Sequence, residues 1–169
     1  ARATSVYLPH TVLPMLPSRL SDNLCSLRAK VPRLAMTVSM EIENDWTIGK
    51  VAAFESVIEV RENLSYEDAL DNSRFQNMIE ASEGLRRNEI RLNLNSAELR
   101  PRVHEDEISV NVKWPNKATE MIETFMVATN NSIGILLGEK NAPLPWRSHA
   151  PPDAPEVEEL NAKFKNMGI

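Results

Sequence analysis

The sequence predicts an α+β fold with a largely antiparallel mixed sheet and packed helices. Several segments alternate apolar and polar residues with a period of two, which is typical of half-buried strands. Others repeat apolar residues every three or four positions, as amphipathic helices do. No proline lies between Pro32 and Pro101, so we expect the regular elements to concentrate in the middle of the chain.

The clearest strand covers residues 34–42. One set of alternate positions there is apolar throughout: Leu34, Met36, Val38, Met40 and Ile42. This spacing predicts a strand with one buried face. Residues 43–45 read Glu-Asn-Asp, which is turn-forming chemistry, and a second alternating run covers residues 48–60. The two runs therefore predict an antiparallel hairpin.

Two helices are expected next. Ser65 has the residue type of an N-cap, and Asp68 occupies the partner position of a capping box, where Glu or Gln is more usual. A second helix is predicted over residues 73–87. Its expected inner face consists of Phe75, Met78, Ile79 and Leu85.

A second strand pair and a long helix complete the prediction. The alternating apolar residues of the strand pair are Ile90, Leu92, Leu94, Ile108, Val110, Val112 and Trp114. Residues 104–107 are expected to form the turn between these strands. The long helix should open at residues 114–116, because proline is favoured in a first turn. Its predicted stripe is Ala118, Ile122, Phe125, Thr129, Ser132 and Leu136.

Composition narrows the possible functions. A chain of 169 residues with 42% hydrophobic and 25% charged residues can build a globular core. A net charge of −5 argues against a protein that coats nucleic acid with its whole surface. No apolar run approaches the roughly 20 residues of a membrane-spanning helix. The single cysteine, Cys25, excludes an internal disulfide framework, and its leucine neighbours predict a buried core thiol.

Generic catalytic motifs are missing from the sequence. It contains no GxGxxG, Walker loop, HExxH or CxxC pattern. The three histidines, His10, His104 and His149, are widely separated, so structural or solvent-exposed roles are favoured for them. The acidic run at residues 105–107 could offer oxygen ligands to a divalent cation, but a solvated hairpin turn explains it better.

The first 27 residues carry a more specific signal. They contain the stretches SVYLP from Ser5, VLPMLP from Val12 and LSDNLCSL from Leu20. Together these stretches resemble a segment inside the RNB catalytic domain of the ribonuclease II and ribonuclease R family. Weaker similarity to the family continues through RLAM at Arg33, FESVI at Phe54, LSY at Leu64, IETFMVATN at Ile122, and RSH at Arg147 with Pro151.

This resemblance implies a processive exoribonuclease that removes nucleoside 5′-monophosphates from the 3′ end of single-stranded RNA. In the family, a cluster of aspartates holds Mg²⁺ ions. Tyr7 matches an aromatic residue that stacks on bases near the 3′ end. Tyr66 matches the tyrosine that positions the terminal nucleotide and sets the length of the final product. Stacking suits both roles, because an aromatic face grips any base and contributes about 1–3 kcal/mol.

The chain also departs from the family pattern. The opposing aromatic of the base clamp falls near Leu92, and residues 87–89 replace a glycine-rich stretch. The family's aspartates lie upstream of the SVYLP segment, and its catalytic arginine lies beyond the RSH segment. We therefore expect residues 1–169 to be the central part of an RNB-like domain, truncated at both ends, with no catalytic residue and no metal ligand of its own.

Several further expectations follow from the resemblance. This chain alone should be inactive, and flanking OB-type RNA-binding domains should accompany it in the parent protein. The expected compartment is the cytoplasm or an organellar matrix, with no membrane partner. The alternative is an RNB-like protein without catalysis that acts as an RNA-binding or scaffold subunit of a ribonucleoprotein. The substitution at Leu92 gives that alternative some support.

Overall fold

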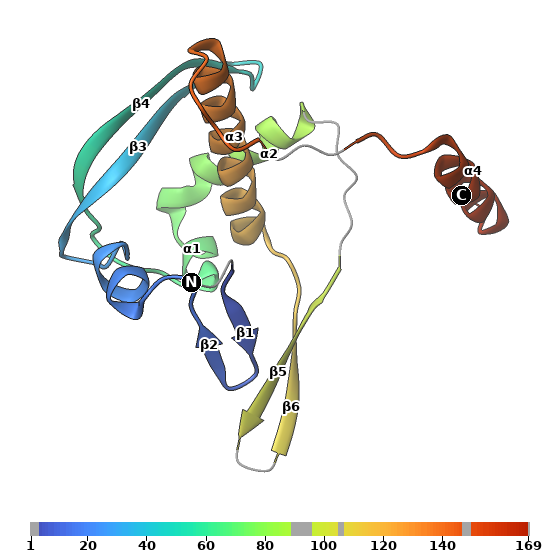
Figure 1. Cartoon of the computed structure of the whole chain (residues 1–169), viewed down its shortest axis with the longest axis horizontal. Helices are drawn as coiled ribbons and strands as arrows, with labels where there is room; N and C mark the ends of the chain where they lie inside the picture. Colours follow the sequence, from blue (N-terminus) through green and yellow to red (C-terminus); the bar gives the residue numbers. More distant parts are fainter. Residues whose placement is uncertain (1–3, 89–95, 105–106, 147–149, 169) are drawn as a thin grey trace. The chain divides into compact units, whose positions relative to one another are not determined.

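The computed structural model describes residues 4–88, 96–104, 107–146 and 150–168 (Figure 1). The chain divides into two compact units, Ala1–Leu136 and Leu137–Ile169. The first unit contains the strands and most of the helices, and the second contains the end of helix α3 and helix α4. Within the described ranges, no helix combines the length and apolar character needed to cross a bilayer.

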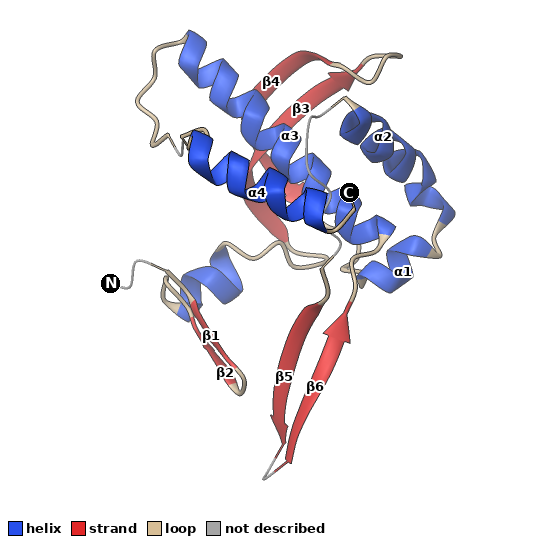
Figure 2. Ribbon diagram, turned by 90° about the vertical axis from the view of Figure 1, so that its right-hand side faces the viewer, coloured by secondary structure: helices blue, strands red, loops and turns tan. Residues whose placement is uncertain are grey.

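The strands form three separate antiparallel hairpins among the described residues (Figure 2). They are β1 (Val6–Leu8) with β2 (Thr11–Leu13), β3 (Pro32–Ile42) with β4 (Ile48–Glu59), and β5 (Glu98–His104) with β6 (Glu107–Lys113). The helical elements are η1 (Arg19–Leu24), α1 (Tyr66–Leu70), η2 (Ser73–Phe75), α2 (Gln76–Arg87), α3 (Lys117–Glu139) and α4 (Ala154–Asn166). The predicted α+β class with antiparallel pairing is confirmed, in the form of separate two-stranded ribbons.

The hairpin β3–β4 has the predicted strands and turn. Its register places Thr37 opposite Phe54, and the Thr37 and Ser56 hydroxyls lie 2.7 Å apart. In the turn, Asp45 Oδ1 accepts hydrogen bonds from the Thr47 amide at 3.0 Å and from its hydroxyl at 2.6 Å. These bonds lower the pKa of the Asp45 carboxyl, the side-chain bond most strongly. Trp46 follows with φ of 65°, in the left-handed region that bulky residues rarely adopt.

The apolar face of β3 is covered over only half of its length. Ser132 Oγ, on α3, lies 3.5 Å from Met40 Sδ, so the helix packs over the end of the strand next to the turn. At the other end Leu34 is 86% exposed and Met36 is 66% exposed. The prediction of one continuous buried face is therefore wrong for its first half. Strand periodicity shows which side chains share a face, but it does not show whether another element covers them.

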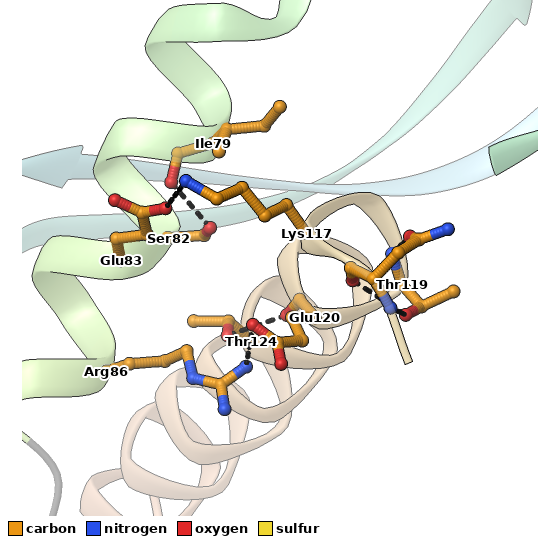
Figure 3. A network of polar contacts seen from close by, with 9 residues as sticks. Ile79, Ser82, Glu83, Arg86, Lys117, Thr119, Glu120 and Thr124 are labelled. Carbon is orange, nitrogen blue, oxygen red and sulfur yellow. Dashed lines mark hydrogen bonds and ion pairs between the residues drawn. The ribbon is translucent and has the colours of Figure 1, made fainter. Parts of the chain in front are cut away.

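The core lies where α2 meets α3. Its buried apolar residues are Ile79, Leu85, Ala118, Met121 and Ala128. Two ion pairs join the helices: Arg86 Nη1 lies 3.1 Å from Glu120 Oε2, and Lys117 Nζ lies 2.8 Å from Glu83 Oε1 (Figure 3).

The predicted inner face of α2 is half right. Ile79 and Leu85 are buried, whereas Met78 is exposed and Phe75 is half-buried. The expected helix over residues 73–87 is present, but its first turn is the 3₁₀ segment η2. Gly84 is buried because the Trp46 indole from the β3–β4 turn lies directly against it.

The buried stripe of α3 differs from the predicted one. Ala118 and Ser132 are buried as expected, but Ile122 is exposed. The remaining buried positions are Met121, Thr124 and Ala128. Small side chains make up most of this face, so a search for large apolar residues does not find it. Thr124 satisfies its hydroxyl by donating to the Glu120 carbonyl oxygen at 2.8 Å.

The start of α3 also differs in detail. Asn116 caps the helix: its Oδ1 accepts from the Thr119 amide at 2.9 Å, and its own amide donates to Thr119 Oγ1 at 2.8 Å. The helix begins at Lys117, so Pro115 lies before the first turn and not within it.

Other expectations need correction. The partner of β6 is β5, which the sequence analysis does not predict although its Leu99, Pro101 and Val103 alternate with polar residues. Proline is tolerated there because each strand of a two-stranded ribbon is an edge strand. The predicted strand at residues 90–94 lies outside the described residues.

Cys25 is exposed and not a core thiol. The prolines of the first segment did not prevent the short hairpin β1–β2, and α4 was also not predicted.

Candidate functional site

Tyr66 is the first residue of α1, and the helix cap fixes its position. The capping box predicted for Ser65 and Asp68 is confirmed. The Asp68 amide donates to Ser65 Oγ at 3.0 Å, and the Ser65 amide donates to Asp68 Oδ2 at 3.2 Å. The hydrogen bonds from Ser65, the side-chain bond first, hold the pKa of the Asp68 carboxyl below its usual value. This reciprocal cap holds the backbone at Tyr66 in place.

A cation from another element lies over the Tyr66 ring. Lys113, the last residue of β6, places its Nζ 5.0 Å from the ring centroid. The same ammonium lies 3.9 Å from Glu67 Oε1. An ammonium over an aromatic face is attracted by the ring quadrupole. The contact joins the end of β6 to the start of α1. Tyr66 is still 39% exposed, so part of its side chain remains accessible to solvent.

An open cavity of about 280 Å³ lies beside Tyr66. Its size is near the lower end of the roughly 300–1,000 Å³ typical of small-molecule sites. The lining residues come from α1, from the β5–β6 ribbon and the segments next to it, and from the first two turns of α3: Tyr66, Ser96, Glu98, Lys113, Trp114, Pro115, Thr119 and Glu123. The walls thus combine two aromatic rings, two carboxylates, one ammonium and two hydroxyls. Such a set can stack on a flat ligand and hydrogen-bond to its edge.

Tyr7 lies in a different place. It is on β1, opposite Val12, and is 79% exposed. It is not one of the described residues that line the cavity beside Tyr66. The amide of Met15 donates to Ser5 Oγ at 3.0 Å, which secures the base of this hairpin. The two sequence-predicted tyrosines are therefore both accessible, and they belong to separate surface features.

The structure also bears on the candidate metal ligands of the sequence. Among the described residues, no three His, Cys, Asp or Glu side chains come close enough to share a metal ion. These residues therefore do not fit the Mg²⁺ that the resemblance implies. Residues 105 and 106 of the acidic run, Leu92, Glu89 and His149 lie outside the described residues.

Lys113 and Trp114 are the site residues that the sequence analysis missed. Trp114 was assigned to a strand face, and Lys113 was given no role. The available signal was a cation and an aromatic at the end of an alternating run, followed by Pro115. That signal becomes specific only when the fold brings this strand end to Tyr66.

Comparison with known proteins decides the family. A model of the RNB domain matches residues 1–169, the whole of the chain. This chain belongs to the RNB domain family. The chain is 31% identical to Ribonuclease R of Thermotoga maritima over 189 aligned positions, which cover 99% of the chain and 26% of that relative. It is 35% identical over 150 positions to "Exosome complex exonuclease RRP44 homolog A" of Arabidopsis thaliana, covering 78% of the chain and 16% of the relative.

Solved structures of the family share the fold. Mycoplasma genitalium RNase R in complex with ribose-methylated single-stranded RNA superposes with a TM-score of 0.86 at 25% identity, covering 98% of this chain and 29% of that one. The same enzyme in complex with double-stranded RNA gives a TM-score of 0.85 and covers 98% of this chain and 33% of that one. This RNB chain thus spans about a quarter of the length of these Ribonuclease R relatives, whose alignments cover 99% of the chain.

Proposed function

We propose that this RNB chain is the substrate-positioning part of a processive exoribonuclease that degrades single-stranded RNA from its 3′ end to nucleoside 5′-monophosphates. The family membership supports a ribonuclease, and the RNA complexes of a structural relative support RNA as the ligand. The observation that carries the proposal is the cavity beside Tyr66, whose ring is held at the first position of a capped helix.

In this proposal Tyr66 positions the terminal nucleotide. An aromatic ring held by a helix cap and covered on one side by Lys113 is preorganised, so little conformational entropy is lost when it contacts a ligand. Tyr7 stacks on a base elsewhere along the strand, since its exposed ring presents a face that accepts any base. Neither role requires sequence recognition, which suits an enzyme that degrades RNA residue by residue.

The chemistry of hydrolysis is assigned to other parts of the parent protein. Because the described residues hold no cluster that fits a metal ion, we propose that the Mg²⁺ ions and their aspartates lie outside them. The chain alone is then inactive. Incubation of the purified chain with labelled RNA and Mg²⁺ should leave the RNA intact, and metal-dependent shortening would overturn this part of the proposal.

The proposed surroundings follow the family resemblance. OB-type domains flank this part in the parent protein, and the protein works in the cytoplasm or an organellar matrix. The single cysteine is consistent with a reducing compartment.

Binding to single-stranded RNA tests the function. In a fluorescence anisotropy titration, Tyr66→Ala should bind a labelled single-stranded oligonucleotide about tenfold more weakly than the wild type does. This is the loss of affinity expected for one stacked base. Tyr66→Phe keeps the ring and should bind like the wild type. Trp146→Ala removes an exposed aromatic of the second unit and serves as the matched control. Equal affinities for Tyr66→Ala and wild type would refute the role of this site.

A further inference from the structure

The helix cap fixes the backbone of Tyr66, but it does not fix the side chain. The cap bonds join Ser65 to Asp68 and leave the side-chain torsions of Tyr66 unconstrained. Because Tyr66 is 39% exposed, packing restricts these torsions only in part. Reproducible placement of a nucleotide on the ring therefore needs a further contact that holds the ring in one orientation.

Lys113 makes such a contact. Its Nζ lies over the Tyr66 ring, 5.0 Å from the centroid, and 3.9 Å from Oε1 of Glu67, the next residue of α1. The ammonium is thus attracted by a ring and a carboxylate at consecutive positions of one helix. The Lys113 side chain is only 32% exposed, whereas most lysines are largely exposed, so this position covers much of it.

The backbone of Lys113 is held on both sides. Lys113 is the last residue of β6, and the ribbon register sets it opposite Glu98. Three residues further on, Asn116 caps α3 through reciprocal bonds with Thr119. Pro115, which lies between them, has a restricted φ angle. The lysine stem therefore starts from a fixed point of the fold, which lowers the entropy lost when its ammonium holds the ring.

The same geometry argues against a direct phosphate contact by Lys113. Its ammonium is already attracted to Tyr66 and to the carboxylate of Glu67. A phosphate placed beside this ammonium would be repelled by that carboxylate. A base that stacks on Tyr66 must use the ring face that the ammonium does not cover.

We infer that Lys113 is a positioning residue for the RNA substrate: its ammonium holds the Tyr66 ring in one orientation and leaves the opposite ring face to the base of the terminal nucleotide. This inference rests on the proposed function and concerns the same cavity. It gives no preference for one base, because the cation acts on the ring and not on the base. Lys113 then contributes to RNA affinity only while the Tyr66 ring is present.

A double-mutant cycle tests the inference. In anisotropy titrations of the 169-residue chain with a labelled single-stranded RNA, Lys113→Met should weaken binding about two- to fivefold, the loss of one cation–π contact at a partly exposed site. In a Tyr66→Ala background, the same substitution should cause no further loss. Lys113→Arg should bind like the wild type, because a guanidinium is also attracted to an aromatic face. Lys113→Gln, which is polar but uncharged, should repeat the result of Lys113→Met.

Salt dependence separates ring positioning from a phosphate contact. If Lys113 neutralised one phosphate, Lys113→Met would reduce the slope of log affinity against log salt concentration by about 0.7. We expect Lys113→Met to retain the wild-type slope. Lys117→Met is the matched control, because it removes a lysine that pairs with Glu83 at 2.8 Å and is not one of the described residues that line the cavity. It should leave RNA affinity unchanged.

The outcomes separate the two proposals. Far-UV circular dichroism confirms that each variant is folded. If Tyr66→Ala weakens binding but Lys113→Met and Lys113→Gln bind like the wild type, the inference is overturned and the proposed function stands. Equal losses in both backgrounds, a reduced salt slope, or no rescue by Lys113→Arg would also overturn the inference alone. If Tyr66→Ala binds RNA like the wild type, the proposed role of this site fails and the inference fails with it.

Discussion

The contact between Trp46 and Gly84 gives the sharpest stability prediction. A Cβ added at Gly84 would overlap the Trp46 indole. In a helix interior, replacement of glycine by alanine normally stabilises by about 0.5–1 kcal/mol. Overpacking a filled site costs about 1–3 kcal/mol. Because the second term is larger, we expect Gly84→Ala to lower the free energy of unfolding by about 0.5–2 kcal/mol.

A matched control and a second background isolate the cause. At Gly138, in α3, an added Cβ would lie 3.5 Å from Trp146 Cη2, an ordinary contact, so Gly138→Ala should cause no loss of stability. With Trp46 already replaced by alanine, Gly84→Ala should instead stabilise by about 0.5–1 kcal/mol, since only the helix propensity remains. Urea unfolding followed by far-UV circular dichroism measures the free energy of unfolding of the wild type, the three single variants and the double variant. A Gly84→Ala effect of the same sign in both backgrounds would refute the packing argument.

Three further predictions follow from the helix cap, the ion pairs and Tyr7. Ser65→Ala should lower the free energy of unfolding by about 0.5–2 kcal/mol, because it removes the side-chain cap of α1. Urea unfolding measures this difference, and an unchanged free energy would show that the cap is not needed. The hydrogen bond and charge of Lys117 lower the pKa of Glu83 from 4.5, so the pair stabilises above pH 4.5 and this contribution is lost as the pH falls through the lowered pKa. Glu83→Gln should therefore destabilise at pH 7 and progressively less below pH 4.5, whereas an equal effect at both would contradict the ion-pair role. In the intact parent protein, Tyr7→Ala should weaken RNA binding by about tenfold, measured by anisotropy, with unchanged binding as the contrary result.

The sequence patterns predicted those elements whose signals are local. The hairpin β3–β4 follows from strict alternation and an Asp-containing turn, and the cap at Ser65 follows from two residues three positions apart. Such signals need no knowledge of the rest of the fold. The resemblance carried by the opening segment likewise identified the RNB family directly from sequence.

The elements that sequence reasoning missed depend on contacts between distant segments. Leu34 has the same spacing as Met40, yet only Met40 lies under α3. The buried face of α3 consists mainly of small residues such as Ala128. Which face of a helix is buried depends on the elements that pack against it, and a local pattern does not show these. The cavity beside Tyr66 requires Lys113, which lies 47 positions further along the chain, so no local pattern reveals it.

The most direct test of the central claim is the limit product of the intact parent protein. A labelled single-stranded RNA is digested to completion by the wild type and by Tyr66→Ala, and the residual fragments are sized on a sequencing gel. If Tyr66 positions the terminal nucleotide, the variant should leave a fragment of different length while still degrading the RNA. The same limit product from both proteins would contradict the assignment of Tyr66 and of the cavity around it.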